Sequence, residues 1–341
     1  MGYDIHIYYG IDEEFLNCDI LCLISKSVIP QLKETSTVFT KEGPVISLIN
    51  KARKYANKII WCDNSDSTSV THFEILPHVD LYLKKQLFKD KSLYNREFYG
   101  GRIFTEFYHQ KYGVIDQNAF SQFYPLPNQL SSKVRLSWNI GMGDMFNAFT
   151  KRNKIRHYVP DLWNVSYNFP TMSVFSKKNF DIFLSTSANL HRPTVAYHRK
   201  ELIKKLRAIL KEKKLSGSIN GKRLTTAALR NVMKMTKILP SPFGWGEIGV
   251  RDYEAFINGA LLLKPNMNHM ETFPDIFIDN ETYLGFDWSF DDLSEVIDDI
   301  LSDVDRRLQI AQQGQKAYLD SISYKGMIKF CSWFERQIVL V

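Results

Sequence analysis

The chain has 341 residues, 44% of them hydrophobic and 13% aromatic, which is enough for two domains with proper cores. Its net charge of +7 favours anionic partners: a phosphorylated small molecule, a membrane surface or nucleic acid. The four cysteines form no CxxC pair and have no zinc-like spacing, so neither a disulfide framework nor a metal site is predicted. There is no apolar leader and no apolar run near 20 residues, so we expect a cytoplasmic protein.

The first part of the chain alternates between apolar strands and helical patterns. A helix is expected over 42–57, and strands are expected at IHIYYG (5–10), CDILCLIS (18–25), KIIWCD (58–63) and VDLYLKK (79–85). This alternation predicts a parallel sheet with helices on both faces. Residues 100–180 are less regular, and 161–179 are interpreted as an irregular connection.

A second unit of the same kind is expected to begin near residue 176. FDIFLSTS (180–187) predicts a strand that leads into a polar loop, and residues 196–214 predict a strongly basic helix. A further helical stretch then precedes the short apolar run KILPS (237–241). The fold class predicted from these patterns is α/β, with two separate units.

The stretch SPFGWGEIGVRDYEAFINGALLLKP (241–265) holds the clearest site pattern. It predicts a helix from about Ile248 to Asn258, a stop at Gly259, and a buried parallel strand at ALLLKP. Glu247 and Glu254 are seven residues apart and project on the same side of a helix. A glycine-rich loop before a helix lets backbone N–H groups approach a phosphate, and a carboxylate on the helix can bind ribose hydroxyls. The alternative is that the glycines only form turns and the glutamates face solvent.

EAFINGALLLKP resembles the E-A-x-x-x-G signature of retaining-type GT-B glycosyltransferases, and residues 275–318 are similar to the C-terminal part of that family. The likeness covers roughly residues 180–320 and is nearest to the CgeB-like and group 1 enzymes of bacterial surface polysaccharide assembly. It implies two Rossmann-like domains facing a cleft, with the C-terminal helix crossing back to the first domain. The acceptor-side domain would be 1–175 plus the helix 325–341, and the donor-binding domain 176–324.

The resemblance also suggests roles for individual residues. Glu254 matches the glutamate that binds the donor ribose. Glu247 is the nearest match to the family's first glutamate but lies one residue closer than usual, which leaves retention or inversion open. The donor-binding candidates are Arg192, Arg199, Lys200, Gly244, Gly246, Glu247, Arg251 and Glu254. For Arg192 and Arg199 a solvated helix face is an equal alternative; His191 is a further phosphate candidate.

Two other stretches carry candidate site residues. Asp63, Asp66 and His72 follow a predicted strand and could act as general base toward an acceptor hydroxyl, with Glu247 as a further catalytic candidate. The alternative for Asp63 and Asp66 is a structural Asx turn. WNIGMGDMF (138–146) lacks a full G-x-G-x-x-G, so no dinucleotide site is expected, although Gly141, Gly143 and Asp144 could line the cleft.

The resemblance therefore implies a metal-independent hexosyl- or deoxyhexosyltransferase. Its partners would be a nucleoside diphosphate sugar and a glycan or lipid-linked acceptor of lipopolysaccharide, O-antigen or capsule, with no other cofactor and no nucleic acid. The basic helix 196–214 suggests peripheral contact with the inner face of the plasma membrane. A nucleic-acid-binding or modifying protein is the alternative, although no such motif is recognisable. A Rossmann-like protein without catalytic activity is a third.

Overall fold

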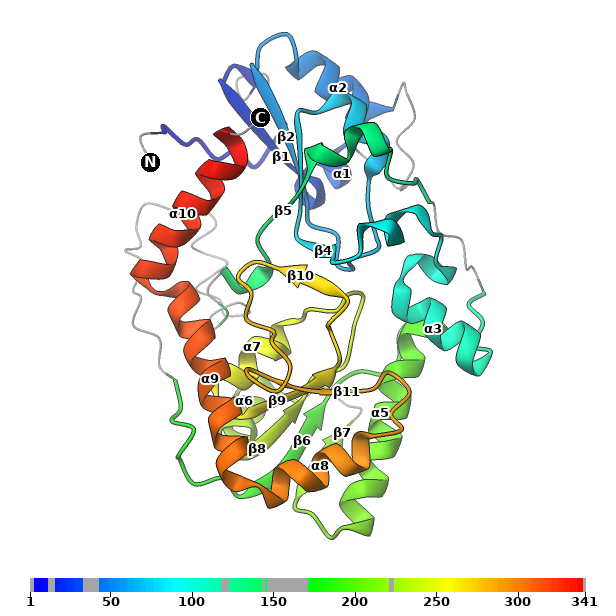
Figure 1. The fold of residues 1–341 in the computed structure, drawn as a ribbon, viewed down its shortest axis with the longest axis vertical. Helices are drawn as coiled ribbons and strands as arrows, with labels where there is room; N and C mark the ends of the chain where they lie inside the picture. The colour runs from blue at the N-terminus through cyan, green and yellow to red at the C-terminus, as the bar shows by residue number, and fades with distance from the viewer. Residues whose placement is uncertain are drawn as a thin grey trace.

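The computed structural model describes residues 3–11, 16–32, 43–117, 123–142, 145, 171–220 and 224–339 (Figure 1). Two β-sheets, each built of parallel strands, lie at opposite ends of the long axis, and helices pack against each of them. In the described part of the chain, the four-stranded and the five-stranded parallel sheets share no strand. The predicted α/β class with two separate units is confirmed.

The first sheet has four parallel strands in the order β1-β2-β3-β5. Their bounds are β1 (Ile20–Ile24), β2 (Lys58–Asp63), β3 (Leu81–Lys84) and β5 (Val134–Leu136). Helices α1 (Ser25–Gln31) and α2 (Pro44–Ala52) lie between β1 and β2. The predicted helix over 42–57 forms because α2 begins at a proline, which suits the first helical position, and buries Val45, Ile46 and Ile49.

The strand expected at residues 5–10 does not form. The described residues 3–11 have no β-pairing, and Ile5 and Ile7 are each 72% exposed. The β-branched composition favours an extended backbone, but a strand also needs a paired neighbour and a covered face, and this segment has neither. The sequence prediction for this segment was wrong.

The second sheet has five parallel strands in the order β11-β9-β8-β6-β7. Their bounds are β6 (Phe180–Ser185), β7 (Gly217–Asn220), β8 (Thr236–Pro240), β9 (Leu261–Pro265) and β11 (Leu284–Phe286). The helices here are α5 (Pro193–Glu212), α6 (Thr226–Lys234), α7 (Val250–Ile257) and α8 (Leu293–Ser302). Strand β6 lies between β7 and β8, so the direction of winding reverses there. In sheets of this kind, ligands bind in the crevice beyond the carboxyl ends of the strands at such a reversal.

Helix α7 ends where the sequence predicted. Gly259 follows the helix with φ +57°, a left-handed conformation that glycine adopts without steric cost. The turn leads directly into β9, whose five residues are all buried. This local geometry fixes the direction of α7, and with it the direction of the loop that precedes the helix.

The two units contact each other through a pair of strands and a pair of packed helices. Strand β4 (Gln86–Phe88) of the first half pairs antiparallel with β10 (Met270–Thr272) of the second. Helix α3 (Ile103–Tyr112) packs against α5, and its Phe104 and Tyr108 are part of the second core. The remaining short elements are the 3₁₀ segments 73–78, 91–95, 99–101, 128–133 and 140–142. The division after residue 175 stays a prediction, because residues on both sides of it share one core.

The last two helices run along one side of the molecule, from the second sheet to the first (Figure 1). They are α9 (Val304–Ile322) and α10 (Tyr324–Val339). Near the end of α10, Ile338 is buried in a cluster with Ile60 and Leu81 of the first sheet. Lys58 of β2 donates a hydrogen bond to the Ile338 carbonyl at 2.7 Å. The predicted return of the C-terminal helix to the first unit is confirmed.

Candidate functional site

The glycine loop, defined here as residues 241–249, connects β8 to α7 at the reversal point of the second sheet. Its end is held by Asp252, whose Oδ2 accepts a hydrogen bond from the Gly249 amide at 2.9 Å. Ser241 donates to the same carboxylate, and Lys264 Nζ of β9 lies 3.0 Å from Asp252 Oδ1. The loop is therefore anchored at both ends by one buried carboxylate.

Two arginines converge on the glycine loop. Arg199 of α5 donates from Nε to the Phe243 carbonyl at 2.9 Å and from Nη1 to the Ser187 carbonyl at 3.0 Å. Arg251 lies in the first turn of α7, and its Nη1 is buried without a hydrogen-bond partner among the described residues. Burial and the charge of Arg251 lower the pKa of the Arg199 guanidinium. An anion between them would remove the repulsion and satisfy the unpaired donor.

The other donor candidates of this unit lie around these arginines. Glu254 is half-buried on α7, three residues after Arg251, so the two side chains share a face of the helix. Gly244 leaves room for Arg199, since a Cβ built there would lie 2.7 Å from Nη2. Lys200 is exposed on α5. The structure thus brings Arg199, Arg251 and Gly244 together.

Glu247 has a different environment from the one expected of a donor contact. Its side chain is fully buried and accepts hydrogen bonds from Ser67 Oγ (3.0 Å), the Thr68 amide (3.1 Å) and Gln86 Nε2 (2.8 Å), all from the first unit. Burial would raise the pKa of this carboxyl, but His269 and the Thr68 amide hold it below its ordinary value. In this conformation the Glu247 carboxylate ties the two units together.

The glycine loop requires glycine at position 246 because the backbone of the first unit lies very close to it. A Cβ built at Gly246 would lie 1.7 Å from the Asp66 carbonyl oxygen of the first unit. No side chain larger than hydrogen fits at that distance, so a substitution here would separate the two backbones. The glycine loop therefore touches the first unit through its backbone at Gly246 and through the carboxylate of Glu247.

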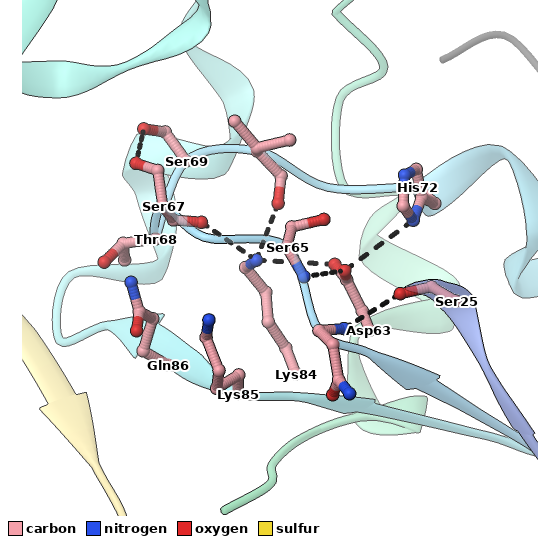
Figure 2. Close-up of polar contacts among 12 residues, drawn as sticks. Ser25, Asp63, Ser65, Ser67, Thr68, Ser69, His72, Lys84, Lys85 and Gln86 are labelled. Carbon is pink, nitrogen blue, oxygen red and sulfur yellow. Dashed lines mark hydrogen bonds and ion pairs between the residues drawn. The ribbon is translucent and has the colours of Figure 1, made fainter. Parts of the chain in front are cut away.

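The opposing surface is the polar loop, defined here as residues 64–72 after β2 (Figure 2). Figure 2 shows the ammonium group of Lys84 enclosed by this loop. Lys84 donates to Asp63 Oδ2 at 3.4 Å and to the carbonyls of Ser67 (3.1 Å) and Val70 (2.6 Å). A fully buried lysine thus fixes the shape of the loop that receives Glu247.

Asp63 is not suited to the role of general base that was predicted for it. The carboxylate is fully buried and accepts from the Ser65 amide at 2.8 Å, which is the Asx turn weighed as the alternative, and from Tyr82 Oη at 2.5 Å. Burial opposes its ionisation, but Lys84 and His72 prevail and lower its pKa. A carboxylate with a lowered pKa and no access to solvent is a poor proton acceptor for a substrate.

The remaining base candidates are Asp66 and His72. Asp66 is partly exposed and forms ion pairs with Lys26 and, at 3.5 Å, with Lys85. His72 is buried, with Nδ1 3.7 Å from Asp63 Oδ1, and burial lowers its pKa. Of the candidates in this region, Asp66 is the carboxylate that a substrate could reach.

The predicted residues outside the glycine loop take several positions. Arg192 turns toward the first unit, where its Nη1 donates to the Gly100 carbonyl at 2.9 Å. The ring of His191 lies against Trp245, with centroids 4.7 Å apart. Gly141 packs under Tyr253, where a Cβ would lie 2.3 Å from the ring. Gly143 and Asp144 lie outside the described residues.

Sequence reasoning missed Lys84, Gln86 and Arg102. Arg102 donates from Nε to the Trp245 carbonyl at 2.7 Å, and its guanidinium carbon lies 5.3 Å from the centroid of the Trp245 ring. A signal for Lys84 was present: a lysine in the apolar run LYLKKQLF must find a partner if the strand is buried. Nothing comparable in the sequence points to Arg102, because its partner lies 143 residues away.

The GT-B arrangement consists of two α/β units, each with a parallel sheet, and a final helix that returns to the first unit. Residues 199–330 match the protein family described as "Glycosyl transferase-like". That stretch includes Arg199, the glycine loop, Arg251 and Glu254. The predicted resemblance to GT-B glycosyltransferases is confirmed.

Three solved structures with similar folds have low sequence identity to this chain. One is a glycosyltransferase from Rickettsia africae (13% identity, TM-score 0.41), of which 90% is covered by 93% of this chain. Another is HepE of Anabaena in complex with UDP (11%, 0.40), of which 82% is covered by 87% of this chain. A third is an alpha-glucosyltransferase in complex with UDP-glucose and DNA (10%, 0.40), of which 81% is covered by 93% of this chain. No curated protein matches the chain by sequence.

Proposed function

We propose that this protein is a glycosyltransferase that transfers a hexosyl or deoxyhexosyl group from a nucleoside diphosphate sugar to a glycan or lipid-linked acceptor. The observation that carries the proposal is the arginine pair at the reversal point of the second sheet. Arg199 and Arg251 form no ion pair within 4.0 Å in the described part of the chain, and one donor of Arg251 is unpaired. A diphosphate supplies the oxyanions that such a pair would bind.

The proposed donor position follows from the elements around the pair. The diphosphate would lie between Arg199 and Arg251, near the backbone of Gly244 and the start of α7, with Lys200 at the edge. The ribose would lie against Glu254 on the same face of α7, where a carboxylate accepts hydrogen bonds from hydroxyl groups. Positive side chains and the helix N-terminus would stabilise the diphosphate as it leaves, a role that needs no metal ion.

The acceptor would approach from the first unit, across from the glycine loop. We propose a place in surface polysaccharide biosynthesis, with peripheral contact at the inner face of the plasma membrane. In support of that contact, α5 exposes Lys204, Lys205 and Lys211, and Lys214 is exposed in the turn that follows. No helix in the described residues is long and apolar enough to cross a membrane.

Calorimetric titration of the full chain with UDP, GDP, ADP and dTDP tests the donor proposal. At least one nucleotide should bind, and Arg251→Gln should weaken that binding by about 10- to 100-fold, the scale of a hydrogen bond to a charged group. Arg336→Gln, an exposed arginine on α10, is the charge-matched control and should leave binding unchanged. Binding that is insensitive to Arg251→Gln, with the fold intact, would contradict the proposal.

A further inference from the structure

A small cavity lies where the first unit meets the beginning of α5. It has a volume of about 120 Å³ and is lined by the polar loop, by the segment after β4 and by Arg192. Pockets that enclose a whole nucleotide-sized ligand are usually about 300–1,000 Å³. The cavity therefore has room for one small charged group and part of a ring, and it is separate from the proposed donor position.

Two guanidinium groups at this cavity donate hydrogen bonds to the same carbonyl oxygen. Arg102 Nη1 and Arg192 Nη1 both donate to the Gly100 carbonyl, at 3.2 and 2.9 Å. Within the described ranges, neither arginine has a carboxylate within 4.0 Å. Burial, and then the charge of Arg192, lower the pKa of Arg102 to about 10. The two guanidinium groups thus donate to two neutral carbonyl oxygens in the described residues, those of Gly100 and Trp245, and these contacts occupy only part of their N–H donors.

The wall of the cavity is aromatic. Phe88, Tyr94 and Phe98 line its buried side, and Phe123 and Tyr124 lie at its edge, 40% and 44% exposed. Aromatic rings pack against the C–H face of a sugar, while a few placed polar groups orient it. Charge on one wall and rings on the other suit a saccharide that bears an acidic group.

Arg192, which directly precedes α5, and Arg199 within α5 contact different units. Arg199 contacts the carbonyls of Phe243 and Ser187 in the second unit, whereas Arg192 contacts Gly100 and lines the cavity with first-unit residues. The sequence makes both of them candidates for the donor diphosphate, with a solvated helix face as the alternative. Their observed contacts place them in different surroundings.

We propose that Arg102 and Arg192 bind the acidic group of the acceptor, so that the acceptor is a sugar carrying a phosphate or a carboxylate. That the ligand is the acceptor rests on the proposed function, whereas the anion site itself does not depend on that function. Arginine binds either oxyanion through two parallel hydrogen bonds. The neutral form of the same sugar would leave both guanidinium groups without a counter-charge.

Ligand-observed NMR titrations of the full chain with glucose 6-phosphate, glucuronate and glucose test the site. At least one acidic sugar should bind about tenfold or more tightly than glucose, and the comparison of the two identifies the preferred oxyanion. Arg102→Gln and Arg192→Gln should each weaken binding of the acidic sugar by about 10- to 100-fold and leave glucose binding unchanged. Circular dichroism reports whether each variant folds.

Arg199→Gln, on the helix that Arg192 directly precedes, provides the matched comparison. It should weaken nucleoside diphosphate binding and leave acidic-sugar binding unchanged, while Arg192→Gln does the opposite. The proposal is overturned if Arg192→Gln weakens nucleotide binding as much as Arg199→Gln does, or if acidic and neutral sugars bind alike. If no nucleotide binds but the acidic sugar still depends on Arg102 and Arg192, the anion site stands and the donor proposal fails.

Discussion

The polar loop and the glycine loop face each other across the two units, but they differ in whether the protein supplies partners for their charged groups. At the start of the polar loop, Asp63 is surrounded by Lys84, Tyr82 and the Ser65 amide, so its negative charge has partners within the protein. Beside the glycine loop, Arg199 and Arg251 lie near each other, and one donor of Arg251 has no partner among the described residues. Groups satisfied by the protein hold its shape, whereas unsatisfied groups are available to a ligand. Variants in the first region should change stability, and variants in the second should change binding.

The largest effect should come from Lys84→Met. This change leaves the Asp63 carboxylate buried without its cation, which costs about 3–5 kcal/mol in the free energy of unfolding. Chemical denaturation followed by circular dichroism measures it. Lys26→Met, which removes the cation of the exposed pair with Asp66, is the control and should cost less than about 1 kcal/mol. Equal, small losses from both variants would remove the contrast between buried and exposed charge on which the comparison depends.

A smaller effect is expected from Glu254→Ala, and it should appear in binding. Loss of the hydrogen bonds to the ribose should weaken nucleoside diphosphate binding by about 1–3 kcal/mol, with little change in the midpoint of unfolding. Glu295→Ala, an exposed glutamate on α8, should change neither quantity. If Glu254→Ala lowers stability and leaves affinity unchanged, the residue belongs with the structural group.

The smallest effect should be membrane binding through α5. Each exposed lysine near an anionic surface contributes up to about 1 kcal/mol, but Lys204 and Lys213 already pair with Glu201 and Asp298. We expect weak pelleting with phosphatidylserine vesicles at low salt and none at high salt. Neutral vesicles are the control. Equal pelleting with both lipids, or with neither, would mean that these lysines do not recruit the protein to an anionic surface.

Local sequence patterns predicted the bounds of some elements correctly. The strand KIIWCD has the same bounds in the structure, and Gly259 ends α7 as expected. The segment at 5–10 failed because strand composition does not provide a neighbouring strand. Helix α3 and the β4–β10 pair were missed because each depends on partners far along the chain.

The site was predicted less completely for the same reason. Helical spacing predicts Glu247 and Glu254 on one side of a helix, but α7 begins only at Val250, so Glu247 lies in the glycine loop before it. The spacing also cannot show that Ser67, Thr68 and Gln86 enclose Glu247. Asp63 had two interpretations of equal weight, and the buried Lys84 decides between them. Arg192 and Arg199 look equivalent in the sequence, and only their carbonyl partners distinguish them.

The path of α10 has a consequence for synthesis of the protein. The contact between Lys58 and the Ile338 carbonyl joins residues 280 positions apart, and Ile338 completes a cluster on the first sheet. On the ribosome, the unit translated first must wait for some of the last residues before that face of its sheet is covered. Helix α3 likewise awaits α5. Assembly of the first unit is therefore completed only after the last helix is translated, and this apolar face of the early strands stays uncovered by α10 until then.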